Sequence, residues 1–186
     1  MIYWLKFAIL LFVFLITGNR FVAAQDWNTA RLSFIGPRNI EVKANSFNEI
    51  NNGITIPGAL IIGFTISDLN EVGASGPLTG FSLSFRTANG IATEMEGVNG
   101  NSIDINTIAV TASNQVGLGS SSFLPPVLLS SVNQTLMSSN TVPCDWSTHQ
   151  ISIQFEFGTA NCTGKLYDQV TDYYTVEIEY TLEPSF

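Results

Sequence analysis

Few residues in this sequence could support catalysis by a nucleophile and a base. A reactive Ser or Cys needs a general base within hydrogen-bond reach, and the only imidazole is His149. It lies directly before an alternating apolar segment, in a run typical of a solvated turn. The run Gly73-Ala74-Ser75-Gly76 lacks the G-x-S-x-G spacing of a nucleophile elbow. We therefore predict no catalytic site of this kind.

Paired carboxylates offer a second route to hydrolysis. Glycoside cleavage needs two of them about 5 to 9.5 Å apart, with the pKa of one raised by apolar surroundings. Glu177 and Glu179 would share one face of a strand at about 7 Å, as would Glu94 and Glu96 in an extended segment. Threonines lie beside the first pair on the same face, which is typical of solvated carboxylates. The sequence therefore predicts that the protein is not an enzyme.

Metal ligands are also scarce. One His and two Cys exclude most zinc sites, because those need about four nitrogen or sulfur ligands. The calcium pattern of the EF-hand is absent. Asp168 with Asp172, or Asp68 with Glu71, could contribute oxygen ligands to a calcium site in a loop, and that alternative stays open. We expect no cofactor.

Two tryptophans, Trp27 and Trp146, lie outside the alternating apolar runs of the chain that follows residue 24. Exposed aromatic rings can stack on sugars, so both are candidate glycan-binding residues. The alternative is that the two tryptophans cover the edge of the hydrophobic core. Asn133-Gln134-Thr135 and Asn161-Cys162-Thr163 match the N-glycosylation sequon. These sequons have meaning only if the source is eukaryotic.

Residues 1–24 have the parts of a secretory signal peptide. Lys6 supplies the positive charge, residues 7–16 form an unbroken apolar run, and Val22-Ala23-Ala24 offers small residues for cleavage. A transmembrane anchor is the alternative, but a spanning helix needs roughly 20 apolar residues. We expect a secreted protein, located in the periplasm, at the cell surface or outside the cell, whose mature chain 25–186 is a single domain without a membrane span.

The mature chain is acidic. The full sequence has 7 Lys+Arg and 15 Asp+Glu, a formal net charge of -8, and removal of Lys6 and Arg20 brings it to -10. Such a charge repels phosphate backbones and anionic headgroups, so we expect no nucleic-acid partner and no docking on membranes.

Cys144 and Cys162 both belong to the exported part. An oxidising compartment favours a disulfide between them, worth about 3 kcal/mol in the chain-entropy model. Bridged Cα atoms lie within about 7 Å of each other. The sequence therefore predicts a turn at 147–150 that folds Cys144 antiparallel onto the strand at 151–157, beside Cys162.

Apolar residues alternate with polar ones through most of the mature chain, as in strands with one buried face. The runs are 30–34, 81–85, 103–110, 151–157 and 174–182, and 54–66 is apolar enough for burial on both faces. Gly- and Asn-rich clusters such as 45–53 separate them as turns. Helix signals are nearly absent, and 124–137 is as well explained by an irregular edge strand. The prediction is all-β: a single antiparallel β-sandwich, immunoglobulin-like or a pilin-like Greek key, with one disulfide.

Residues 172–180 begin with Asp172, continue with apolar residues at every second place and end in Tyr180. This segment resembles the closing strand of bacterial pilus subunits of the spore-coat-U and chaperone–usher type. The signal peptide, the acidic Gly/Asn/Ser-rich chain and the alternating N-terminal segment are similar to those of a secreted fimbrial subunit. The chain departs from the usual pilin in its late cysteines and in the residues Glu183-Pro184-Ser185-Phe186 after the strand.

The resemblance implies an incomplete sandwich that a neighbour's N-terminal strand completes, with a periplasmic chaperone and an usher as further partners. The donor strand would be 29–35, with Ala30, Leu32 and Phe34 pointing inward. The preferred alternative is that this segment is the first strand of its own sandwich.

Three functions follow, and a secreted hydrolase that uses a carboxylate pair is the least favoured of them. The first is a non-enzymatic structural or adhesive subunit of a cell surface, fimbrial in type, that assembles with like subunits or other surface proteins through strand contacts. The alternative is a secreted carbohydrate-binding module that uses Trp27 or Trp146.

Overall fold

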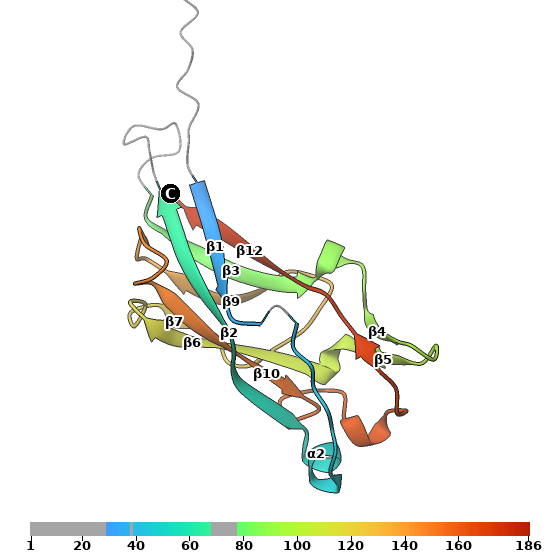
Figure 1. The fold of residues 1–186 in the computed structure, drawn as a ribbon. Coiled ribbons are helices and arrows are strands. Elements are labelled where there is room, and N and C mark those ends of the chain that lie inside the picture. Colours follow the sequence, from blue (N-terminus) through green and yellow to red (C-terminus); the bar gives the residue numbers. More distant parts are fainter. Residues whose placement is uncertain (1–28, 38, 68–77) are drawn as a thin grey trace, which may run out of the picture.

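The computed structural model describes residues 29–37, 39–67 and 78–186. Antiparallel strands dominate this part of the chain, which confirms the all-β antiparallel prediction (Figure 1). The predicted signal peptide, Trp27, Asp68, Glu71 and the 73–76 run lie outside the described residues. Among the helices of the described part, none is long and apolar enough to cross a membrane.

The described strands form three sheets. The five-stranded sheet has the order β1 (Thr29–Ile35), β2 (Ile54–Ser67), β10 (Gln150–Phe157), β6 (Ile108–Val116) and β8 (Val127–Leu128). The four-stranded sheet has the order β12 (Ile178–Ser185), β3 (Gly80–Thr87), β9 (Gln134–Ser139) and β7 (Ser122–Phe123). The small sheet has the order β11 (Tyr174–Thr175), β4 (Glu94–Gly97) and β5 (Ser102–Asp104). Single turns of 3-10 helix lie at η1 (Ala88–Gly90), η2 (Ile105–Thr107) and η3 (Leu166–Asp168).

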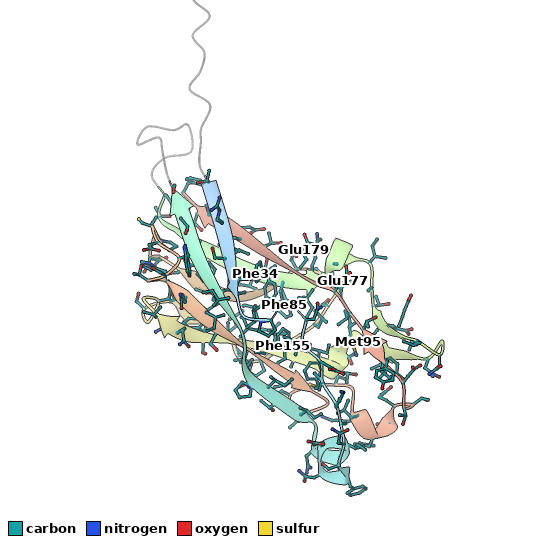
Figure 2. The ribbon with its side chains drawn as sticks, in the orientation of Figure 1. Phe34, Phe85, Met95, Phe155, Glu177 and Glu179 are labelled. Carbon is teal, nitrogen blue, oxygen red and sulfur yellow. The ribbon has the colours of Figure 1, made fainter. Side chains whose placement is uncertain are left out.

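One hydrophobic core joins these sheets. The runs at β3, β6 and β10 and the apolar stretch of β2 supply most of that core, and Phe64 of β2 and Phe81 of β3 are fully buried with ring centroids 4.8 Å apart. Met95 of β4 belongs to the same cluster, as do Phe85 and Phe155, which Figure 2 labels. The period of two in the sequence therefore identified the buried faces of β3 and most of β10, but not those of β1, whose residues are not buried.

The prediction of a turn without a helix at 45–53 is wrong. The segment contains α2 (Phe47–Asn52), which begins with a capping box. Ser46 Oγ accepts a hydrogen bond from the Glu49 amide at 3.2 Å, and the Glu49 carboxylate accepts one from the Ser46 amide at 2.9 Å. None of the α2 residues is buried. These local hydrogen bonds stabilise a helix that the apolar residues, which lack helical periodicity, did not predict. In 124–137 the irregular strands β8 and β9 confirm the alternative to a helix.

The predicted disulfide is wrong, because Cys144 and Cys162 are both free. Cys144 is exposed and follows Pro143, whose carbonyl accepts a hydrogen bond from Ile66 at the end of β2. Cys162 is buried beyond the other end of β10, with Sγ 3.6 Å from the carbonyl of Glu156. β10 lies between them and spans roughly 25 Å. The predicted hairpin cannot form, since β2 and β6 already occupy both edges of β10.

Candidate functional site

β1 is an edge strand, and its only strand partner among the described residues is β2. The pairing runs from Thr29 opposite Ser67 to Ile35 opposite Ile61, with no shift of register. The structure therefore places the candidate donor segment as the first strand of its own sheet. Figure 1 shows β1 near β12, the edge strand of the four-stranded sheet.

β1 contributes little to the core. None of its seven residues is buried, although every one of them has a main-chain partner in β2. Of the three residues predicted to point inward, Leu32 is half-buried against the core, Ala30 is exposed and Phe34 is 46% exposed. Main-chain hydrogen bonds therefore hold this strand more than side-chain burial does, and such bonds would be the same with any chain that offers the same backbone.

Phe34 connects β1 to the second sheet (Figure 2). Its ring centroid lies 5.9 Å from that of Tyr180 in β12, and Tyr180 lies 6.4 Å from Phe85. Burial raises the pKa of the Tyr180 hydroxyl well above its usual value, and this hydroxyl has no hydrogen-bond partner among the described residues. A buried polar group without a partner costs about 1–3 kcal/mol. The unpaired Tyr180 hydroxyl therefore lowers the stability of the packing beneath β1.

The Trp146 turn, residues 145–149, is the second candidate site. The Asp145 carboxylate accepts hydrogen bonds from the Ser147 amide at 2.8 Å and from Ser147 Oγ at 2.9 Å. These bonds, the amide first, lower the pKa of Asp145 below its ordinary value. Thr148 Oγ1 donates to the Asp145 carbonyl at 3.1 Å. The turn therefore has a fixed shape.

The turn packs closely on the large sheet and leaves its indole accessible. A Cβ atom added at Gly63 of β2 would lie 2.7 Å from the Trp146 carbonyl oxygen, so only glycine allows this approach. The Trp146 residue is nevertheless 44% exposed. His149 lies in the same turn, with Nδ1 3.0 Å from Thr148 Oγ1, so the imidazole contributes to turn structure. Trp146 is the one tryptophan candidate that can be placed, because Trp27 lies outside the described residues.

The carboxylate pairs have polar surroundings. Glu179 forms an ion pair with Arg86 at 3.1 Å, and Glu177 is exposed in the adjoining segment (Figure 2). Glu94 and Glu96 are both exposed on β4. Neither pair has the apolar enclosure that a catalytic carboxylate pair needs.

The oxygen ligands suggested for calcium have other partners. The Asp172 carboxylate accepts hydrogen bonds from the side chains of Asn101 and Asn99, both at 2.9 Å, and from the Asn99 amide. The Asn101 bond is the main cause of the lowered pKa of Asp172. Within 29–37, 39–67 and 78–186, no group of three or more His, Cys, Asp or Glu side chains could hold a metal ion. Asp68 and Glu71 are not described, so that alternative stays untested.

Sequence reasoning missed one buried carboxylate. Glu156 in β10 is 5% exposed, and its carboxylate accepts hydrogen bonds from Thr159 Oγ1 at 2.6 Å, Asn161 Nδ2 at 2.9 Å and Gln154 Nε2 at 3.0 Å. Its place among the polar positions of an alternating run gave no signal of burial. The side-chain amide of Asn161, in the second sequon, therefore donates a hydrogen bond to Glu156. Asn133, in the first sequon, is exposed in the segment before β9.

Comparisons with known proteins do not add to this geometry. No protein-family model matches the chain, and no curated protein matches it. Function is therefore inferred from the placement of β1 and of the Trp146 turn.

Proposed function

We propose that this protein is a secreted, non-enzymatic structural or adhesive subunit of a cell surface, and that it assembles with like subunits by exchange of β1. The fold in this proposal is one β-sandwich, immunoglobulin-like or pilin-like, formed by the five- and four-stranded sheets around their common core. The assembly has no disulfide. A periplasmic chaperone and an usher are the accessory partners that such assembly would require.

The observation that carries the proposal is the way β1 is held. Its backbone pairs over seven residues with β2, while none of its side chains is buried. By contrast, Ile62, Phe64 and Ile66 of the neighbouring strand are almost completely buried. β1 can therefore leave with a small loss of apolar burial, and the core residues of β2 to β12 stay within one chain.

The chain around β1 is compatible with exchange. Residues 39–45 form neither helix nor strand before α2 begins, so β1 is not tied directly to the next element. In the exchanged state, the segment from Ile61 to Ser67 would pair with β1 of a neighbouring subunit. Leu32 and Phe34 of that neighbour would take the same places against the core and Tyr180. The main-chain bonds lost in one subunit would be regained in the next.

Deletion and complementation test the proposal. Removal of residues 25–36 from the mature chain should abolish concentration-dependent polymers seen by sedimentation velocity. A synthetic peptide of residues 25–36 should bind the shortened protein and raise its melting temperature, because it fills the vacant edge of β2. The same peptide with Leu32→Asp and Phe34→Asp is the control and should not bind. Polymers that persist after the deletion would contradict strand exchange.

Trp146 supports carbohydrate binding as the second candidate function. Trp146 is 44% exposed as a residue and lies on a hydrogen-bonded turn, so it offers a preorganised surface for stacking, with polar neighbours for sugar hydroxyls. If this function holds, binding on a glycan array should be lost with Trp146→Ala and kept with Tyr167→Ala, an exposed tyrosine in η3. The absence of any glycan that depends on Trp146 would exclude it.

A further inference from the structure

The exposed edges of the sheets differ in how well they are protected against pairing with another chain. β5, β7, β8 and β11 have only two or three residues each. β12 is long, but Glu179, Glu183 and Pro184 lie in it. Charged side chains and proline are the common means by which proteins prevent pairing at an edge.

Two long strands are only partly covered by their neighbours, and both carry irregularities there. The half of β2 that β1 does not cover contains Pro57, and Gly58 has φ of 60 beside a shift of register against β10. The part of β6 beyond β8 ends at another shift, where Gln115 has no partner in β10. Proline and bulges of this kind also disfavour an added strand.

β1 has none of these protections. It has seven residues in continuous register with β2, no proline, no acidic residue and one charge, on Arg31. Within the described residues, its backbone makes hydrogen bonds to β2 and to no other element. The edge of β1 that faces away from β2 is therefore a long, regular edge that makes no backbone hydrogen bond within the described residues, although β12 lies near β1 and Tyr180 of β12 packs against Phe34.

The sequence of β1 is complementary to itself. In an antiparallel pair that uses all seven residues, Leu32 lies on the two-fold axis and faces Leu32 of the second copy. The large Phe34 lies opposite the small Ala30, on the face directed to the core. On the other face, Arg31 lies opposite Ser33 and Thr29 opposite Ile35. No two like charges are directly opposed, and the pairing would cover Ala30 and Phe34, which one chain leaves exposed.

We propose that the free edge of β1 pairs antiparallel with β1 of a second copy, about a two-fold axis at Leu32, and joins the two five-stranded sheets into one. This inference rests on the proposed function, because both use β1 as the site of assembly. Strand exchange uses the edge of β1 that binds β2, whereas this contact uses the opposite edge. A pair of seven-residue edges buries little surface, so the dimer is weak and reversible.

Charge substitution at Ser33 tests this contact. Ser33 lies opposite Gly63 within its own sheet, so a new side chain there has no directly opposed side chain in β2. In the dimer, each of the two copies of residue 33 would lie opposite Arg31 of the other copy. Ser33→Lys should raise the dissociation constant roughly threefold to tenfold, and Ser33→Glu should lower it by a similar factor. Ser138→Lys and Ser138→Glu, at an exposed position of β9, are the matched controls and should leave the constant unchanged.

The measurement is sedimentation equilibrium of the mature chain with β1 held in its own subunit. Thr29→Cys with Ser67→Cys places a disulfide across directly opposed residues, and Cys144→Ser removes the exposed natural thiol. This lock prevents strand exchange but leaves the outer edge and Arg31 intact. The inference is overturned if the locked protein stays monomeric up to about 1 mM. It is also overturned if Ser33→Lys and Ser33→Glu have equal dissociation constants, or if the Ser138 variants change the dissociation constant as the Ser33 variants do.

The lock also separates this inference from the proposed function. If unlocked protein forms polymers that the lock abolishes, while locked protein stays monomeric, edge pairing fails and strand exchange stands. If locked protein dimerises with the predicted response at Ser33 but unlocked protein forms no larger species, edge pairing stands and strand exchange fails.

Discussion

At the scale of single residues, Glu156 shows how a polar position in a strand can become part of the interior. Its carboxylate is buried at the end of β10 and is enclosed by the 158–165 segment, where Lys165 Nζ donates to the carbonyls of Thr159 and Cys162. Burial alone would raise the pKa of Glu156. The hydrogen bonds from Thr159, Asn161 and Gln154 outweigh that effect and lower it.

We predict that Glu156→Gln lowers the free energy of unfolding by about 1–3 kcal/mol at pH 7, because an amide cannot accept all three hydrogen bonds. A pKa that is lower in the folded state stabilises the protein above the unfolded pKa of about 4.3, and that contribution is lost as pH falls through the folded pKa. The difference between the two proteins in urea unfolding should therefore shrink below about pH 4. Glu183→Gln, on an exposed residue of β12, is the control. A difference that does not depend on pH would refute this role for the carboxylate.

The two cysteines give a second prediction at this scale. Because the protein has no disulfide, its melting temperature should be the same with and without a reductant. Exposed Cys144 should react with a maleimide in the native protein, whereas Cys162, which is 4% exposed, should react only after unfolding. Mass spectrometry of the labelled protein reads both sites. A native protein without any free thiol would contradict the observed separation of the cysteines.

At the scale of elements, the hairpin of β4 and β5 is held by hydrogen bonds to Asp172, a residue distant from it in the sequence. Asp172, in the segment before β11, binds Asn99 and Asn101 at the tip of this hairpin. A Cβ atom at Gly97 would overlap the Asp172 carboxylate, so glycine allows the close approach. These hydrogen bonds act as a brace and fix a loop whose Val98 side chain is 76% exposed.

We predict that Asp172→Ala speeds hydrogen exchange at the Asn99 amide, since that amide loses its acceptor, while the global melting temperature stays nearly unchanged. Asp168→Ala in η3 is the control and should not affect Asn99. Because the pKa of Asp172 is lowered mainly by Asn101, the brace should persist below the ordinary Asp pKa of about 3.9 and open only at lower pH. Unaltered exchange at Asn99 in the variant would show that the carboxylate does not hold the tip.

The elements also show which features the sequence could reveal. Alternation of apolar residues located β3, β10 and the shared run of β11 and β12, because a strand with one buried face must repeat every second residue. The helix α2 was readable too, since Ser46 and Glu49 have the spacing of a capping box. Its apolar residues, such as Phe47 at 83% exposure, do not face a core, so a search for helical periodicity missed it.

At the scale of the whole molecule, the partners of each strand were not predictable in the same way. The disulfide prediction failed because local spacing cannot show that β2 and β6, distant in sequence, occupy both edges of β10. Similarly, the sequence gives no sign that Glu156 is enclosed or that Tyr180 lies beneath Phe34. These features depend on the order of strands in the sheets, which alternation does not specify.

The placement of β1 matters most for the proposed function, because it determines what one chain can offer another. The strand completes its own sheet, yet it contributes main-chain bonds rather than buried side chains. Its inner edge pairs with β2 of its own chain, and in the proposed assembly it would pair with β2 of a neighbour. Its outer edge makes no backbone hydrogen bond to another described strand.

The central claim is tested most directly by sedimentation velocity of the locked protein before and after reduction. With Thr29→Cys, Ser67→Cys and Cys144→Ser, the oxidised protein should form no species larger than a dimer, because β1 cannot leave β2. Addition of a reductant should restore concentration-dependent polymers. A control lock between β3 and β12, Ser82→Cys with Glu183→Cys, should polymerise in both states. Polymers of the oxidised Thr29–Ser67 variant that equal those of the reduced protein would contradict assembly by exchange of β1.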